Sequence, residues 1–312
     1  MVAARTLARG LGSLTAAGAL GLSYALAESR AYTLRRFELP VLPAGTAPLR
    51  VLHLSDLHLT PRNHREVSWV RSLNGLEPDL VVNTGDNLAS LQGVPTVLDA
   101  LTPLLERPGV FVLGSNDYYA PKVKNPARYL STSGTHRRVL GRPLPTSDLV
   151  DGLTSAGWLN LTNRRDALTV HGVRLGFVGV DDPHLRLDRY PALDGAAPKP
   201  SDLTIGVTHA PYQRVLDAMA SEQLPLVLAG HTHGGQLRLP GYGALVTNCD
   251  LDRGRARGVS RWWLGAGTSA TSTTPPDDAT WLHVSAGLGT SPFTPVRFAC
   301  RPEASLLTLT AR

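Results

Sequence analysis

The residues with the clearest chemical potential are aspartates and histidines that directly follow short apolar runs. Asp56 and His58 come after the run at 49–54, and His231 and His233 repeat the i, i+2 spacing further along the chain. On an extended backbone, residues i and i+2 point to the same side, so each pair can reach one ion. A mixture of carboxylate oxygen and imidazole nitrogen suits Mn, Fe or Zn.

Further candidate ligands follow other apolar runs. Asp86 follows LVVNTG, Asn116 and Asp117 follow VFVLGS, and His209 follows LTIGVT. Taken singly, a Gly-Asp pair is usually a turn and a lone histidine is usually structural. Open α/β sheets place their sites at the carboxyl ends of strands, where all of these residues fall. The sequence therefore predicts that they converge on one site.

Short apolar runs separated by helical stretches predict an α/β fold with buried strands. The expected strands are 49–54, 79–83, 110–113, 167–170, 173–180, 203–207, 226–229, 281–284, 296–299 and 305–309, and the expected helices are 63–74, 94–106 and 211–221. Two sheets covered by helices would accommodate them. We thus expect a two-sheet β-sandwich flanked by helices, with an apolar helix at the N-terminus.

The ordered set of polar residues resembles the calcineurin-like metallophosphoesterase family over roughly residues 49–310. The family pattern is Asp-x-His, Gly-Asp, Gly-Asn-His, His and Gly-His-x-His. The resemblance implies an αββα fold and two divalent metal ions (Mn, Fe or Zn) with a bridging hydroxide that attacks a phosphoester. One metal would take Asp56, His58 and His233, the second Asn116, His209 and His231, and Asp86 would bridge them.

One position departs from the family pattern. Asp117 stands where the family usually has a histidine that assists the phosphoryl oxygen or the leaving group. An ionised Asp117 would repel a phosphate dianion, whereas a carboxyl kept protonated by burial could act as a general acid. We therefore predict a catalytic role for Asp117 and a preference for diesters or for good leaving groups.

The C-terminal residues 283–309 resemble a bacterial branch of the family that has a membrane-associated N-terminus. That branch includes enzymes that cut phosphodiester or pyrophosphate bonds in lipid-linked substrates, and it commonly has an arginine where this chain has Ala286. The leading interpretation is a hydrolase of phosphodiesters, pyrophosphates or phosphomonoesters, including lipid-linked ones. A phosphoprotein or nucleotide phosphatase and a metal-binding protein with little catalysis are the alternatives.

The chain divides into three parts before its structure is considered. Residues 1–27 contain an uncharged run that predicts a membrane anchor, with export after cleavage near Ala27 or a packed terminal helix as alternatives. Arginines flank the run on both sides, so orientation is open. Residues 28–48 are predicted to be a Pro-rich connector and residues 49–312 the catalytic domain.

The net charge of +6 and a pI near 9.6 fit an anionic partner or simply a basic soluble protein. A basic insertion at 120–147 follows the third cluster, and its Lys122, Lys124 and Arg128 are candidate substrate or membrane contacts, a solvated loop being the alternative. Aromatic residues are only 6% and no recognition module is evident, so a nucleic-acid partner is not expected. The spacing of Cys249 and Cys300 excludes a Cys-x-x-Cys motif and leaves their pairing open.

Overall fold

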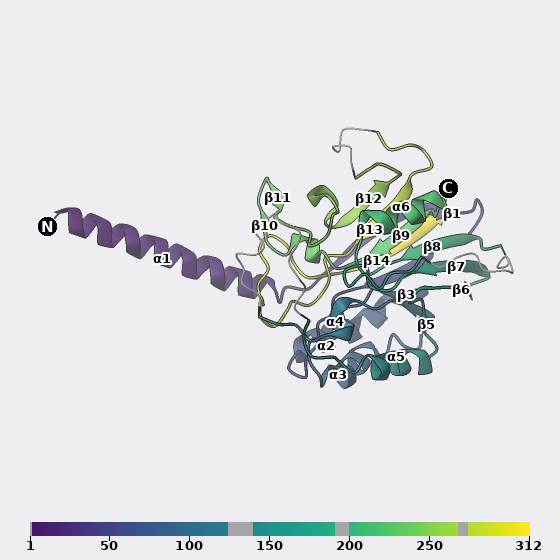
Figure 1. The fold of residues 1–312 in the computed structure, drawn as a ribbon, viewed down its shortest axis with the longest axis horizontal. Helices are drawn as coiled ribbons and strands as arrows, with labels where there is room; N and C mark the ends of the chain where they lie inside the picture. The colour runs from purple at the N-terminus through teal and green to yellow at the C-terminus, as the bar shows by residue number, and fades with distance from the viewer. Residues whose placement is uncertain (1, 124–139, 191–199, 268–273) are drawn as a thin grey trace.

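Two six-stranded sheets form the body of the protein (Figure 1). This computed structural model describes residues 2–123, 140–190, 200–267 and 274–312, with side chains from Thr15 onward. The first sheet contains, in spatial order, β1 (Thr33–Leu42), β14 (Glu303–Ala311), β2 (Leu49–Leu54), β3 (Leu80–Asn83), β4 (Gly109–Phe111) and β5 (Leu159–Asn160). The second contains β12 (Gly258–Trp262), β13 (Thr280–Val284), β9 (Leu226–Ala229), β8 (Leu203–Val207), β7 (Val173–Gly179) and β6 (Arg164–Val170).

The longer helices of the body, α2 (His64–Ser72), α3 (Gly93–Leu101), α5 (Thr146–Ser155) and α6 (Gln213–Ser221), lie on the outer faces of the two sheets. The shorter elements are α4 (Ser115–Tyr118) and the 3-10 turns η1 (Leu73–Leu76), η3 (His233–Gly235) and η4 (Arg253–Arg255). A two-stranded hairpin, β10 (Arg238–Leu239) and β11 (Gly243–Ala244), stands apart from both sheets. Figure 1 shows α2, α3 and α5 together on the lower side of the body.

The alternation of side chains along each strand builds the layers. In β2, Val51 joins the apolar core shared by the two sheets, while Leu52 and Leu54 join the core under α2, α3 and α5. On the far side, Met219 of α6 packs with the outer face of the second sheet. The order helix, sheet, sheet, helix confirms the predicted mixed α/β sandwich.

Most of the predicted strands are confirmed, but two expectations about the chain are wrong. Residues 296–299 form no strand, and Phe298 makes only an isolated bridge with Leu237. Residues 33–42, predicted as connector, form β1, which pairs in parallel with β14 along its length. Proline has no N–H to donate, so it is tolerated on edge strands and at bulges. β1 is an edge strand, and its register with β14 shifts between Pro40 and Leu42.

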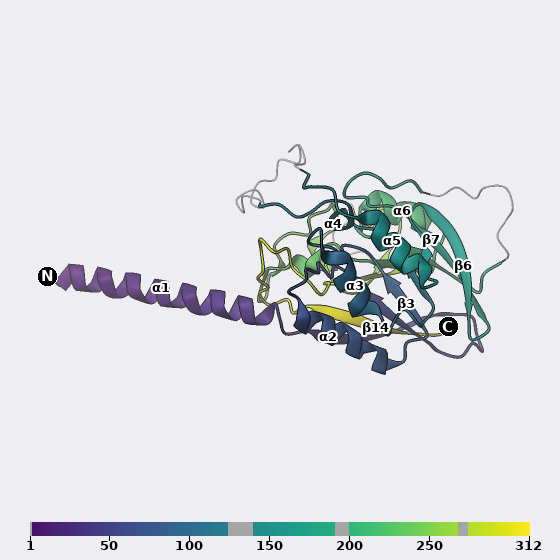
Figure 2. The ribbon, with the colours of Figure 1, turned by 90° about the horizontal axis from the view of Figure 1, so that it is seen from below.

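A long helix, α1 (Val2–Glu28), projects from one end of the body in both views (Figures 1 and 2). Its last turn is held by the loop before β14: the Arg297 N–H donates to the Ala25 carbonyl at 3.1 Å, and the Ala299 N–H donates to Glu28 at 2.8 Å. Among the helices that the structure describes, none combines the length and apolar character needed to cross a bilayer.

A buried histidine pair joins the two sheets behind the polar strand ends. His53 Nδ1 lies 2.9 Å from His283 Nδ1, and His53 Nε2 lies 3.0 Å from the Thr84 hydroxyl. His53 therefore faces inward and is fully buried. Burial lowers the pKa of both rings, that of His283 to about 3, so both are neutral in the folded protein near neutral pH.

This pair predicts a loss of stability in acid. A histidine whose folded pKa lies below its unfolded value of 6.5 stabilises the fold above pH 6.5, and this stability is lost as pH falls toward 3. At about pH 4.5 the loss from His283 alone should be about 2–3 kcal/mol. In His283→Gln the free energy of unfolding, measured by urea denaturation, should therefore fall less steeply with pH than in the unsubstituted protein. The exposed His171→Gln is the control, and equal slopes in all three proteins would contradict the prediction.

Candidate metal centre

The seven predicted ligands converge at the carboxyl ends of β2, β3, β4, β8 and β9. They come from five loops that are up to about 180 residues apart in sequence, and each loop leaves a strand whose side chains are buried on both faces. Parallel pairing of β2 with β3, β3 with β4, and β8 with β9 aligns these exits at one edge. The sheet topology therefore brings the polar clusters together at one site, as predicted.

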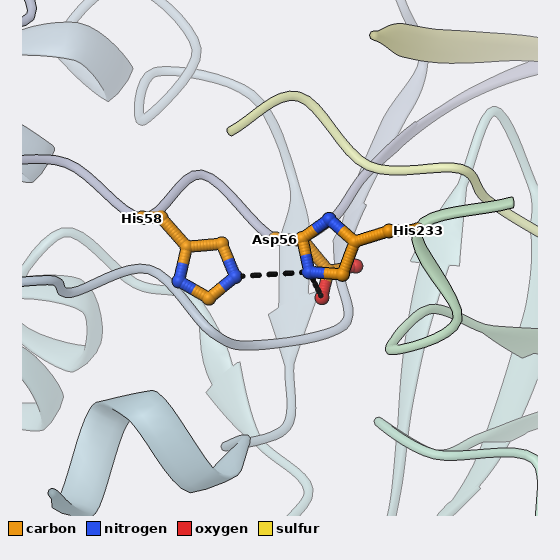
Figure 3. Close-up of side chains that lie close together, drawn as sticks. All are labelled: Asp56, His58 and His233. Atoms are coloured by element: carbon orange, nitrogen blue, oxygen red, sulfur yellow. Dashed lines mark hydrogen bonds and ion pairs between the residues drawn. The ribbon is translucent and has the colours of Figure 1, made fainter. Parts of the chain in front are cut away.

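The first group consists of Asp56, His58 and His233 (Figure 3). The Nε2 atoms of His58 and His233 lie 3.1 Å apart, and the Asp56 Oδ1 atom lies 3.5 Å from His233 Nε2. Asp56 Oδ1 is buried and has no hydrogen-bond partner among the described residues. Two imidazole nitrogens and an unsatisfied carboxylate oxygen facing one point are a donor set that fits a divalent transition metal.

The second group is built around Asp86. Its Oδ1 lies 3.5 Å from His209 Nε2, and its Oδ2 lies 3.6 Å from His58 Nε2 in the first group. Asn116 donates to Asp86 from its backbone N–H and from its side-chain amide, each at 2.7 Å. His231 Nδ1 lies 3.2 Å from His209 Nε2. Asp86 thus stands between two sets of ligand atoms, as a bridging carboxylate would.

The backbone that presents these side chains is unusual. Asp56, His58, Asp86, His231 and His233 all have a positive φ, between 45° and 68°. Each such non-glycine residue costs of order 1 kcal/mol or more, and strain of this kind concentrates at functional sites. The side chains in each i, i+2 pair therefore converge through left-handed turns, and the extended backbone assumed from the sequence is wrong.

Glycines allow the loops to approach closely. Gly85 has φ +87°, and a Cβ atom there would lie 2.5 Å from the Gly114 nitrogen. A Cβ at Gly114 would collide with the Asp86 carboxylate and with the His209 ring at 2.7 Å. Both positions therefore exclude any larger residue while the loops keep this spacing.

Burial and the neighbouring charges set the protonation of the site. Burial lowers the pKa of His58 and of His233, which keeps both rings neutral and able to offer a lone pair. Burial also opposes the charged form of His209, but the Asp86 and Asp56 carboxylates outweigh it and raise the pKa of His209 to about 9. The same His209, with His58 and the hydrogen bonds from Asn116, holds the pKa of Asp86 well below its usual range despite burial.

The structure gives Asp117 a different position from the one expected. Its side chain is fully buried and accepts hydrogen bonds from the backbone N–H groups of Gly114, Asp86 and Asn87, at 2.7–2.9 Å. Burial raises the pKa of Asp117 to about 7, and the nearby Asp86 adds to this. With both oxygens engaged by the backbone, Asp117 holds the Asp86 loop to the Asn116 loop, and this geometry does not support the predicted general acid.

The other sequence candidates lie at the margin or outside the described chain. Lys122 is exposed, and Lys124 and Arg128 lie outside the described residues. Cys249 and Cys300 are both free thiols, so they do not pair. Ala286, where the related branch commonly has arginine, is fully buried.

Two contacts of the candidate ligands were not predicted. The buried Arg297 places its Nη2 3.3 Å from His233 Nδ1, and it donates to the carbonyls of Gly287 and Gly289. On the other side, the His184 ring lies 4.6 Å from the His231 ring, and its Nδ1 lies 3.1 Å from the Tyr212 hydroxyl. Neither Arg297 nor His184 belongs to a sequence motif, so the sequence offered no signal for these two residues.

Known proteins match the part of the chain that carries the candidate ligands. The model of the family described as calcineurin-like phosphoesterase matches residues 49–235. A Bos taurus "transmembrane protein with metallophosphoesterase domain" is 31% identical over 211 residues, 64% of this chain and 44% of the relative, so the chain spans less than half of that relative's length. The Bacillus subtilis metallophosphoesterase YkuE is 26% identical over 96% of this chain and 92% of its own. The Escherichia coli phosphodiesterase YaeI is 26% identical over 67% of this chain and 69% of its own.

Proposed function

Because the chain belongs to the calcineurin-like phosphoesterase family, we propose that it is a metal-dependent hydrolase whose preferred substrates are phosphodiesters. The observation that carries the proposal is the convergence of His58 Nε2, His233 Nε2 and the unsatisfied Asp56 Oδ1. Asp56, His58 and His233 would hold one divalent ion, Asn116, His209 and His231 a second, and Asp86 would contact both. Mn, Fe and Zn all accept this donor set.

Bound divalent ions would supply Lewis acidity and a nucleophilic water near neutral pH. The chain's own residues do the positioning. Asn116 holds the Asp86 carboxylate from two sides, and the His209 Nδ1–H donates to the Thr84 carbonyl at 2.7 Å, which turns His209 Nε2 toward Asp86. Fixed tautomers and orientations of this kind are what a metal site needs before it binds its ion.

The charge of the site supports the diester preference. Asp86 is buried in the site and its pKa is held well below the usual range, so it keeps a negative charge that opposes a doubly charged monoester more than a singly charged diester. The relative named as a phosphodiesterase supports the same substrate class. Lipid-linked phosphodiesters fall within this class, whereas a pyrophosphate is a phosphoanhydride whose P–O–P bond the same attack on phosphorus would cleave.

Hydrolysis of bis-p-nitrophenyl phosphate by the purified protein is the direct test. We expect turnover with Mn²⁺, its loss with EDTA, and slower turnover of p-nitrophenyl phosphate. A clear preference for the monoester would favour the alternative of a phosphoprotein or nucleotide phosphatase. Turnover that survives EDTA would contradict metal dependence and indicate a different chemistry.

Metal binding itself is measured separately from turnover. Mn²⁺ at about a hundredfold excess over its Kd should raise the free energy of unfolding by about 2–3 kcal/mol, because it binds only the folded chain. His58→Ala should lose most of this gain, whereas His171→Ala, on an exposed turn, should keep it. A full gain in unfolding free energy without any turnover of either ester would identify a metal-binding protein with little catalysis.

A further inference from the structure

The exposed apolar side chains of the protein gather at one end. Nine of the fourteen large hydrophobic side chains that are exposed in the described residues come from three segments. The segments are the last turns of α1, the hairpin β10–β11 and the loop before β14, and the nine side chains are Leu20, Leu22, Tyr24, Leu26, Leu237, Leu239, Tyr242, Leu245 and Phe293. We call these nine side chains the apolar end. Scattered exposed leucines are ordinary, but a gathering of this kind marks an interaction surface.

Direct contacts hold the three segments together. The Tyr24 and Phe298 rings meet edge to face at 5.3 Å, and the Arg238 N–H donates to the Phe298 carbonyl at 2.9 Å. Gln236 Nε2 donates to the carbonyls of Thr294 and Val296 at 2.8 and 2.9 Å. Figures 1 and 2 place the end of α1 beside the loop before β14 in both views. The three segments therefore lie side by side at this end of the body.

The charged side chains within these segments are basic. Residues 10–27, 234–249 and 287–301 contain no acidic residue, while the partly exposed Arg238 and the exposed Arg301 lie among them. Arg253 adds a guanidinium that lies 4.7 Å from the centre of the Tyr242 ring. Three carboxylates flank these segments in the sequence: Asp252 pairs with Arg255, while Glu28 and Asp250 accept from the backbone N–H groups of Ala299 and Gln213.

We propose that the apolar end docks on an anionic lipid bilayer, with the β10–β11 hairpin inserted into the interfacial region. Exposed leucines, a tyrosine at the hairpin tip stacked with an arginine and flanking positive charge form the composition that binds such an interface. A second copy of the chain would need a complementary negative face, whereas an anionic bilayer supplies that charge directly. Docking does not depend on the proposed hydrolysis.

Docking would also place the candidate metal centre at the bilayer surface. His233 is the first residue of η3, and the hairpin begins only five residues later. Arg238 Nη1 donates to the Gly234 carbonyl at 2.9 Å, which ties the hairpin to that turn. A phosphodiester in a lipid headgroup would then lie close to His58 and His233.

The test is flotation of the full-length protein with vesicles of phosphatidylcholine and phosphatidylglycerol, compared with phosphatidylcholine alone. We expect binding to the anionic vesicles and a loss of about tenfold or more in the partition coefficient for Leu239→Glu combined with Tyr242→Glu. The matched control combines Leu187→Glu with Leu264→Glu, two exposed leucines elsewhere. Arg253→Gln should weaken binding to anionic vesicles by about fivefold and leave the small binding to neutral ones unchanged.

A second measurement reports insertion directly. Tyr242→Trp should gain fluorescence quenching by lipids brominated on the acyl chain, and Leu264→Trp should not. Three results would overturn the proposal: no flotation of the unsubstituted protein, equal flotation of the hairpin and control variants, or a dimer without vesicles that Leu239→Glu dissociates. The last result would assign the surface to a second copy of the chain.

Discussion

Asp86→Asn is expected to lower kcat/KM for bis-p-nitrophenyl phosphate by at least about 10³-fold, which corresponds to the several kcal/mol that a correctly held metal contributes. The Asp86 carboxylate lies within 3.6 Å of His58 Nε2 and of His209 Nε2, so its charge serves both groups of ligands. Asparagine keeps the shape but removes the negative charge that would offset repulsion between two bound cations. We expect the bound metal, measured by elemental analysis, to fall together with activity.

The control for this variant makes the same chemical change elsewhere. Asp99→Asn replaces an exposed carboxylate that pairs with Arg71 at 2.7 Å, and it should leave both activity and metal content unchanged. Loss of activity with full metal content would show that Asp86 acts other than as a ligand. More than a tenth of the original activity in Asp86→Asn would contradict the proposed bridging position.

Asp117→Ala is expected to lower the free energy of unfolding by about 3–5 kcal/mol, because it leaves three buried backbone N–H groups without an acceptor. These groups belong to Gly114, Asp86 and Asn87, so the two loops that carry Asp86 and Asn116 lose their common anchor. Activity should fall as well, through the displacement of Asp86. Urea denaturation and steady-state kinetics measure the two effects.

Asp117→His separates this structural role from the catalytic one predicted from the sequence. An imidazole cannot accept from all three N–H groups, so we expect a destabilised protein with an unchanged ratio of monoester to diester turnover. Asp99→Ala is the matched surface control and should change stability by less than about 0.5 kcal/mol. A stable Asp117→His protein with a raised monoester ratio would restore the catalytic interpretation.

The sequence was sufficient to predict the layered fold because its signals are local. Buried strands such as 49–54, 203–207 and 226–229 are short apolar runs, and their limits in the structure are those predicted. It failed where structure depends on a distant partner. β1 is an edge strand only because β14, about 270 residues later, pairs with it, and its proline and those that follow it are more typical of a connector.

The candidate ligands could be identified from the sequence by their types, their spacing and their place after apolar runs. Their family pattern also suggested a role for Asp117 from its position alone. The role of a buried carboxyl depends on which groups point at it, and those are the backbone N–H groups of loops 30 residues apart. Arg297 and His184 lie outside any motif, so only the fold brings them beside His233 and His231.

The sequence by itself therefore determined the fold class, the family and the set of polar residues at the strand ends, because periodicity and short motifs are properties of neighbouring residues. The tertiary structure alone decided how those side chains converge, through left-handed turns at Asp56, His58, Asp86, His231 and His233. It also decided that Asp117 accepts from backbone N–H groups and that exposed apolar side chains of three segments gather at one end of the body. These features depend on long-range packing, which can impose a strained backbone or gather exposed leucines without leaving a local pattern.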